Sequence, residues 1–218
     1  MSILNCWSDE QRLLLAVDTH AAVIDPDGAL SRSAGLEPGQ PMHVSKMTVL
    51  PAAHCVLAVR GSGVMPAAVL SGCLGVPNAH FDLLRAKMMW VLAAGMSALR
   101  ASAMAAPGSQ LGARQEVMLV GWSERVSAPG AAYFTKAEGD AAAFVADPDD
   151  DWESHAAPWD DAWGVLPDGD SHEAMLRLAR EQVRLQRIAT PGIALGGHLL
   201  VAEITRKSIA ITEVCDDL

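Results

Sequence analysis

The chain has 218 residues, half of them hydrophobic, and a formal net charge of −10. This length favours one domain, residues 1–218, with a large hydrophobic core. The excess of acid and the lack of any lysine or arginine cluster argue against a nucleic-acid partner, because phosphate binding needs a basic surface.

The apolar content also bears on localisation. The most apolar stretch, Met88 to Leu99, is too short to span a bilayer. The first residues lack the basic and then apolar segments of a secretory signal, so we expect a cytoplasmic protein with no membrane partner. Four scattered cysteines show no paired spacing, and we expect them to be core thiols. The alternative for Cys6, near the start of the chain, is a nucleophile exposed by processing.

The first predicted element is a buried strand at Arg12–Val17, because RLLLAV is a nearly continuous apolar run that ends at Asp18. A turn at Asp25–Gly28 and a surface loop rich in Gly, Ser and Pro are expected next. Two strand-like segments, Lys46–Leu50 and Cys55–Arg60, then predict a hairpin.

Helices and a second hairpin are predicted in the middle of the chain. An Ala, Leu and Met composition with few β-branched residues indicates a short helix near Ala67–Leu74 and a long buried helix over His80–Met104. The segments Glu116–Trp122 and Ala131–Thr135 predict the strands of the second hairpin.

The last third of the chain opens with an acidic insertion, residues 147–170. It contains Trp152, Trp159 and Trp163 and has no clear periodicity, so we expect a loop whose tryptophans contact another subunit. Ser171 is predicted to cap a helix through EAMLRLAREQVRLQRIA, followed by a strand pair, HLLVAEIT and SIAITEV. Helices grouped between strand pairs indicate a layered α+β fold, not a regular βαβ repeat.

Ser2 is a candidate catalytic nucleophile. If Met1 is removed, Ser2 carries both a hydroxyl and a free α-amine, which are a nucleophile and its own base. The unperturbed pKa of such an amine, about 7.7 to 8.0, is close to neutral pH. The ordinary alternative is a serine that merely follows the initiator methionine.

The chain resembles the proteasome β-subunit and HslV-type family of N-terminal nucleophile hydrolases over nearly its whole length. The motifs that carry the resemblance are Ser2, LLLAVD at Leu13–Asp18, SKMTVL at Ser45–Leu50 and LAVRGSG at Leu57–Gly63, in that order. The resemblance implies a four-layer αββα sandwich of the threonine-protease type. It also implies a hydrolase that cleaves amide bonds in peptide or protein substrates and a homo-oligomer, of which a ring is one form.

The resemblance further implies a catalytic set of four residues. The interval from Ser2 to Asp18 matches the family's nucleophile and aspartate, Lys46 matches its lysine, and Gly61 matches the glycine at the far end of the hairpin. A Lys46 ammonium would lower the pKa of the α-amine, Asp18 would orient Lys46, and the Gly61 N–H would stabilise an oxyanion by about 3 kcal/mol. Alternatively, Asp18 and Lys46 form a structural ion pair and Gly61 only a turn.

Other functions remain open. The family sets a serine and an aspartate just before the glycines that match Gly196-Gly197, whereas Thr190–Leu195 contains neither. This difference favours a catalytically silent subunit with a structural or binding role. A small-molecule amidohydrolase that forms no ring is a third hypothesis. The histidines lack HExxH or any close ligand spacing, so no metal or other cofactor is expected.

Overall fold

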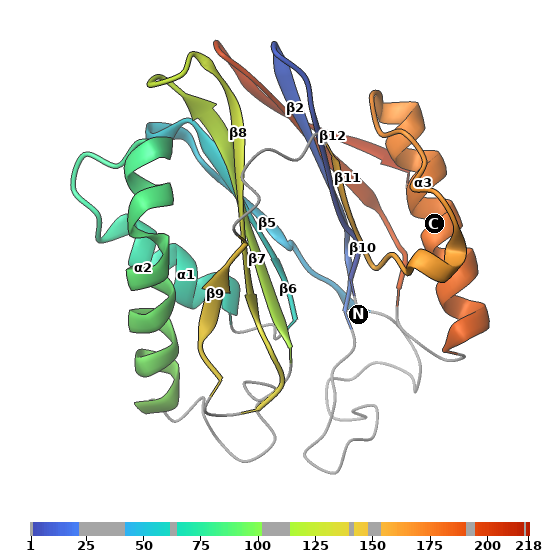
Figure 1. The fold of residues 1–218 in the computed structure, drawn as a ribbon, viewed down its shortest axis with the longest axis horizontal. Helices are drawn as coiled ribbons and strands as arrows, with labels where there is room; N and C mark the ends of the chain where they lie inside the picture. The colour runs from blue at the N-terminus through green and yellow to red at the C-terminus, as the bar shows by residue number, and fades with distance from the viewer. Residues whose placement is uncertain are drawn as a thin grey trace.

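The structure is a computed structural model and describes residues 2–21, 42–61, 65–101, 114–139, 142–147, 154–190, 195–215 and 217–218. These residues form an α+β sandwich with two five-stranded antiparallel sheets and three helices (Figure 1). The predicted turn at Asp25–Gly28, the predicted helix end at 102–104 and Trp152 lie outside the described residues.

The first sheet is built around the predicted apolar strand. Its order is β10 (Ser154–Ala157), β1 (Leu4–Ser8), β2 (Arg12–Asp18), β11 (Leu199–Thr205) and β12 (Ile209–Cys215). The side chains from Leu13 to Val17 are all buried, which confirms a strand covered on both faces. The predicted pair at the end of the chain is also confirmed as β11 and β12.

Strand β1 is the element of this sheet that the sequence pattern missed. Its residues, LNCWS, mix polar and apolar side chains, and Leu4 and Cys6 pack into the core between the sheets. Antiparallel pairing with β2 runs from Leu4 opposite Val17 to Ser8 opposite Leu13. Tertiary pairing therefore decides this strand, as is common where local propensity is weak.

The second sheet confirms both predicted hairpins. β5 (Met47–Leu50) and β6 (Cys55–Arg60) form the first and are joined by the short 3-10 helix η1 (Pro51–Ala53). β7 (Gln115–Ser123) and β8 (Ala128–Lys136) form the second. β6 pairs with β7, so the two hairpins lie side by side in one sheet.

Two smaller elements complete the strands. β9 (Phe144–Ala146) pairs with β8 and gives the sheet order β5-β6-β7-β8-β9. β3 (His20–Ala21), one residue beyond the end of β2, and β4 (Met42–His43) form a separate two-stranded pair.

The three predicted helices are present. They are α1 (Met65–Leu74), α2 (Phe81–Ala101) and α3 (His172–Ala189). The Ser171 hydroxyl accepts a hydrogen bond from the Ala174 N–H at 3.2 Å, which confirms the predicted cap of α3.

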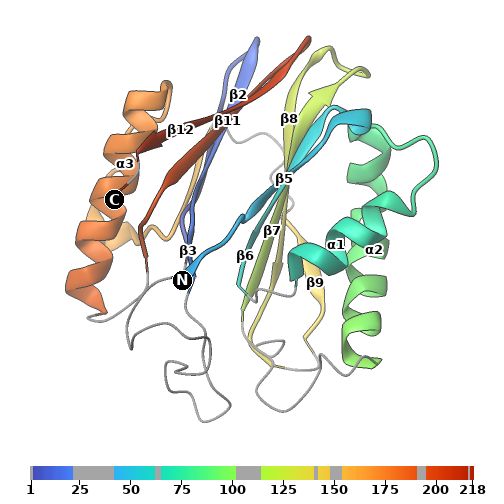
Figure 2. The same cartoon turned by 180° about the vertical axis from the view of Figure 1, so that it is seen from behind.

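Three clusters of buried side chains hold these elements together. One joins α1 and α2 to the second sheet, one fills the space between the sheets, and one joins α3 to the first sheet. Leu13 and Leu15 face the core between the sheets, whereas Leu14 and Ala16 face α3, as strand alternation requires. Figures 1 and 2 show α1 and α2 on one outer side and α3 on the other.

The acidic segment 147–170 is only partly a loop. β10 forms within it and pairs with β1 from Ala157 opposite Leu4 to Ser154 opposite Trp7. The expectation of a loop is wrong there, because SHAA has no β-branched residue and becomes a strand only by pairing with the edge of β1. Another short 3-10 helix, η4 (Asp161–Trp163), follows, and residues 148–153 lie outside the described part of the chain.

Gly121 on β7 marks a close contact between the second sheet and α2. A Cβ atom at this position would lie 2.6 Å from Phe81 Cδ2, 2.7 Å from Cys55 Cβ and 2.9 Å from the His54 carbonyl oxygen. We expect Gly121→Ala to lower the free energy of unfolding by about 1–3 kcal/mol, because the backbone-fixed atoms cannot move away. Urea unfolding measures the loss. Gly75→Ala, whose Cβ would lie 3.3 Å from its nearest neighbour, is the control, and equal losses would contradict the packing argument.

Candidate active site

A buried ion pair links the two sheets. Lys46, immediately before β5, places Nζ 2.7 Å from Oδ1 of Asp18, the last residue of β2. Asp18 is fully buried and the Lys46 side chain is 7% exposed. The structure therefore brings together two of the four predicted site residues.

The Asp18 carboxylate also accepts two backbone hydrogen bonds. The Ile3 N–H donates to Oδ1 at 2.7 Å, and the Gly196 N–H donates to Oδ2 at 3.2 Å. With Lys46, three donors satisfy this buried carboxylate, as a buried charge requires. Asp18 therefore ties the start of the chain to β5 and to the segment before β11.

Ser2 lies next to this network. It immediately precedes Ile3, whose N–H binds Asp18, and Ser2 itself is buried at 7% exposure. The Ile3 N–H and Lys46 Nζ donate to the same oxygen, Asp18 Oδ1, so Ser2 is one residue away from a group in direct contact with this carboxylate. Met1, whose removal an N-terminal mechanism requires, lies outside the described residues.

The surroundings of Lys46 shift its proton affinity. Burial lowers the pKa of Lys46 most, the Asp18 carboxylate raises it, and the nearby Arg60 guanidinium lowers it further. The resulting pKa lies below that of an exposed lysine. A buried lysine with a lowered pKa and a defined partner is a frequent feature of functional sites.

Gly61 directly follows β6, the strand that pairs with the segment after Lys46. The Val59 N–H donates to the Lys46 carbonyl at 2.9 Å, and Gly61 follows two residues later. Its φ of +127° favours glycine, and an added Cβ would lie 2.3 Å from Gln115 Oε1. The predicted glycine therefore lies at the same end of the second sheet as Lys46.

The segment before β11 contributes contacts that sequence reasoning did not identify. The His20 N–H donates to the Gly196 carbonyl at 3.1 Å, and the Thr19 N–H donates to the His198 carbonyl at 3.0 Å. Gly196 and Gly197 have φ values of +130° and +78°. The Gly196-Gly197 pair was the sequence signal for this segment, because a positive φ at each of the two residues favours glycine. Residues 191–194 of the segment noted for lacking a serine or carboxylate lie outside the described residues.

Comparisons with known proteins bear on the fold. No family model matches the chain, and no curated protein matches it. A solved structure, described as the Anbu (Gly-1) mutant from Hyphomicrobium sp. strain MC1, matches with a TM-score of 0.53 and 13% sequence identity. The match covers 98% of this chain and 86% of that one. The chain has a divergent proteasome-like fold. At this identity the likeness concerns the fold alone.

A second polar cluster lies near the ion pair of this proteasome-like fold. The Arg60 guanidinium is 2.5 Å from Glu116 Oε1, and the Arg114 guanidinium is 2.9 Å from the same oxygen. Tyr133 of β8 and His155 of β10 lie with their ring centroids 4.4 Å apart. The signal available in the sequence was a pair of charged residues, Arg60 and Glu116, at the ends of otherwise apolar strands.

His155 makes the stability of the proteasome-like fold depend on pH. Burial lowers the pKa of His155 from its ordinary value of 6.5 to about 4. The unfolded chain therefore takes up a proton first as the pH falls, so stability is complete above about pH 6.5 and declines towards pH 4. We expect His155→Gln to remove up to about 3 kcal/mol of this decline. Urea unfolding at pH 7 and pH 4.5 measures it, with the exposed His80→Gln as control, and an unchanged decline in His155→Gln would contradict the assignment.

The cysteines show no site of their own. Cys6, Cys55 and Cys73 are buried as predicted, whereas Cys215 is only partly buried. Burial raises the pKa of the Cys6 thiol to about 12, so this thiol is protonated at neutral pH and is a poor nucleophile.

Within the described ranges, no group of three or more His, Cys, Asp or Glu side chains could hold a metal ion. No helix in the same ranges is long and apolar enough to cross a membrane.

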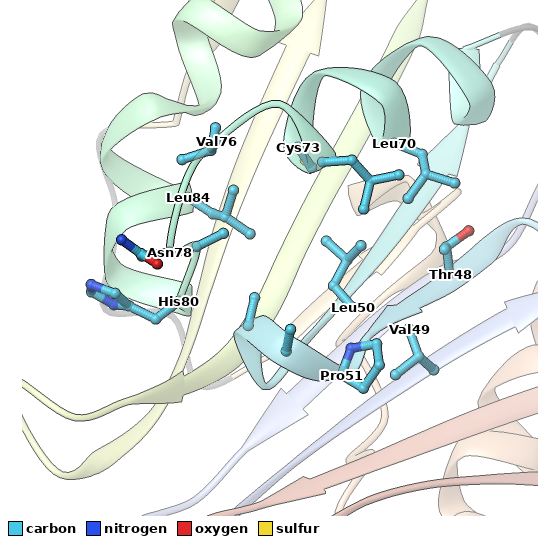
Figure 3. A pocket seen from close by; sticks show the side chains of 14 residues that line it. Thr48, Val49, Leu50, Pro51, Leu70, Cys73, Val76, Asn78, His80 and Leu84 are labelled. Carbon is cyan, nitrogen blue, oxygen red and sulfur yellow. The ribbon is translucent and has the colours of Figure 1, made fainter.

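An apolar cavity of about 770 Å³ lies between the β5–η1 segment and helices α1 and α2 (Figure 3). Its lining is mostly aliphatic, with Thr48, Asn78 and His80 among its polar members. None of the four candidate catalytic residues lines it. This cavity is therefore separate from the candidate active site of the proteasome-like fold.

Proposed function

We propose that the chain is a peptidase or amidohydrolase subunit whose nucleophile is Ser2 after removal of Met1. The supporting observation is the shared oxygen of Asp18, which accepts from the Ile3 N–H and from Lys46 Nζ, each at 2.7 Å. Lys46, whose pKa is lowered, is thereby held close to Ser2. Ser2 becomes the N-terminal residue when Met1 is removed.

The proposed reaction has two steps at Ser2. The α-amine takes the hydroxyl proton as Oγ attacks the amide carbonyl carbon, and the C–N bond then breaks to leave an ester on Ser2. The leaving amine receives the proton from the α-ammonium. Water then cleaves the ester, with the same α-amine as base, and Ser2 is regenerated.

The other three residues support this step in distinct ways. The Lys46 ammonium lowers the pKa of the Ser2 amine, so that more of the amine is neutral and able to accept a proton. Asp18 orients Lys46 through their 2.7 Å contact. The Gly61 N–H is assigned to the oxyanion, where one such donor contributes about 3 kcal/mol.

The architecture that we propose is one four-layer αββα domain over residues 1–218, with the insertion at 147–170. Three buried clusters support this arrangement, since they join α1 and α2 to one sheet, the sheets to each other, and the other sheet to α3. In the proposed architecture, Ser2 just before β1 and Lys46 just before β5 belong to facing sheets, and the Asp18 contacts of Ile3 and Lys46 support this.

We also propose that the chain assembles as a homo-oligomer. Trp159 and Trp163 of the insertion stack edge to face at 5.7 Å, and Leu74 and Trp90 are 73% and 62% exposed. Tryptophan is among the residues most enriched at the hot spots of subunit contacts. Light scattering coupled to size exclusion tests the assembly, and a monomer would favour the small-molecule amidohydrolase hypothesis.

A catalytically silent subunit is the second candidate function. The observation that favours it is the complete set of donors on Asp18, because a network of Lys46, Ile3 and Gly196 is sufficient as a structural device. Such a subunit keeps the ion pair, retains Met1 and performs no hydrolysis.

A serine-directed label separates the two candidates. The chain is incubated with a fluorophosphonate and with fluorogenic peptide amides, and the labelled residue is identified by peptide mapping. The proposed hydrolase forms one adduct on Ser2 of chains that lack Met1. A label confined to another serine, or hydrolysis that continues when Ser2 is fully labelled, would contradict the proposal.

A further inference from the structure

A buried carboxylate lies beside the glycine of the candidate site. Glu116 of β7 is 1% exposed and stands opposite Arg60 of β6 in the sheet register. Burial alone would raise the pKa of Glu116, but Arg60, Tyr133 and Arg114 together outweigh burial and lower it. Glu116 is therefore a buried anion held between two guanidinium groups, at 2.5 and 2.9 Å.

This ion pair is placed to fix the backbone at Gly61. Arg60 immediately precedes Gly61, and Gly61 packs against the residues just before Glu116. An added Cβ on Gly61 would lie 2.3 Å from Gln115 Oε1 and 2.8 Å from the Arg114 carbonyl oxygen. The pairing of Arg60 with Glu116 therefore joins β6 to β7 at the point where Gly61 leaves the sheet.

The same ion pair reaches Lys46. The carbonyl of Lys46 accepts a hydrogen bond from Val59, the residue before Arg60, at 2.9 Å. The Arg60 cation is close enough to Lys46 to lower its pKa, in addition to the larger effect of burial and against that of Asp18. Because Glu116 offsets the Arg60 charge, it limits how strongly Arg60 disfavours the Lys46 ammonium.

The charged and titratable groups that face these residues come from both sheets. Lys46 is faced by Asp18 of β2 and by Arg60 of β6. Ser2, whose amine would titrate once Met1 is removed, precedes Ile3, whose N–H donates to the same Asp18 oxygen as Lys46. The groups around Arg60 and Glu116 are Arg114, Tyr133 of β8 and His155 of β10, the last of which is also influenced by Asp147. Among the described residues, Glu116 is the carboxylate that pairs with Arg60.

We propose that Glu116 is a positioning residue of the Ser2 site: by pairing with Arg60 it fixes the backbone at Gly61 and balances the cation beside Lys46. This inference rests on the function proposed above, because Gly61 and Lys46 serve catalysis only if Ser2 attacks. It adds to that function a residue 114 positions away from Ser2 in the sequence.

Charge substitutions with opposite expected signs test the electrostatic part. The chain is labelled with ¹³C at lysine Cε, and the NMR signal of Lys46, assigned with Lys46→Arg, is titrated without substrate. Glu116→Gln leaves Arg60 unbalanced, so the titration of Lys46 moves to lower pH by roughly 0.5–1 unit. Arg60→Gln removes the cation, so the titration moves to higher pH. Glu116→Asp keeps the wild-type value, as does the control Glu173→Gln on the exposed face of α3.

Kinetics test the positioning part. If Gly61 stabilises the transition state, Glu116→Gln lowers kcat roughly tenfold to a hundredfold with little change in KM, and Glu116→Asp restores much of the loss. If Glu116 had only a structural role, Glu116→Gln would lower thermal stability, but the Lys46 titration would not move in opposite directions in Glu116→Gln and Arg60→Gln. Should Glu116→Gln fail to fold, Arg60→Gln still measures the sign of the Lys46 shift, with Glu116→Asp as the variant expected to keep the wild-type titration; an Arg60→Gln titration that stays in place or moves to lower pH overturns the inference.

Opposite shifts of Lys46 together with the loss of kcat support the inference. Identical titrations in all variants, or shifts of one sign in Glu116→Gln and Arg60→Gln, overturn it. The titration needs no substrate, so opposite shifts in a chain without Ser2-dependent hydrolysis overturn the proposed function and leave the electrostatic coupling standing.

Discussion

Replacing Ser2 with alanine is expected to abolish the hydrolysis of peptide amides while folding and assembly stay intact. Only the Oγ atom is lost, and the contact of Ile3 with Asp18 uses the backbone, so the ion pair with Lys46 remains. Loss of a nucleophile typically lowers kcat by about a thousandfold or more. Initial rates with fluorogenic peptides measure the loss, and light scattering measures assembly.

Two further substitutions sharpen this prediction. Ser2→Thr keeps a hydroxyl and a free α-amine, so we expect it to retain hydrolysis. Ser71→Ala removes an exposed serine on α1 and is expected to change nothing. Wild-type rates in Ser2→Ala would show that another residue is the nucleophile.

Replacing Asp18 with alanine is expected to cost about 3–5 kcal/mol of the free energy of unfolding. The change leaves the Lys46 ammonium buried without its carboxylate and removes the acceptor of the Ile3 and Gly196 N–H groups. Without Asp18, the pKa of Lys46 falls further, so the unfolded chain binds more protons than the folded one. The loss of stability therefore shrinks as the pH rises.

Urea unfolding across a range of pH values measures this effect. Glu10→Ala, an exposed carboxylate in the turn between β1 and β2, is the control and should change stability by no more than about 0.5 kcal/mol. A loss below about 1 kcal/mol in Asp18→Ala, or a loss independent of pH, would show that the pair contributes little to the fold.

Much of the fold could be predicted because its central strands are apolar on both faces. Leu13 to Val17 form such a run, and the hairpins around η1 and Ser127 show strand propensity with turn residues between. β1 and β10 could not be predicted, because their residues have weak strand propensity and become strands through pairing.

Part of the candidate site was expected from the resemblance to the N-terminal nucleophile hydrolases, which matched residues at recognisable places in the strand pattern. Asp18 ends an apolar run and Lys46 opens a hairpin, and these two residues are in contact. Gly196 was not predictable as a partner of Asp18, because 178 residues separate them and only the pairing of β2 with β11 brings them together. The contact of Arg60 with Glu116 likewise depends on the register of β6 and β7.

Ser2 can act as an N-terminal nucleophile only if Met1 is removed, and the intact mass of the chain expressed from Met1 shows whether it is. The mass is measured before and after incubation with a fluorophosphonate, for the wild type and for Ser2→Ala. A nucleophilic Ser2 predicts the loss of one methionine and one adduct per wild-type chain, with no adduct on Ser2→Ala. Retention of Met1 with no adduct would contradict it and leave a silent structural or binding subunit as the better explanation.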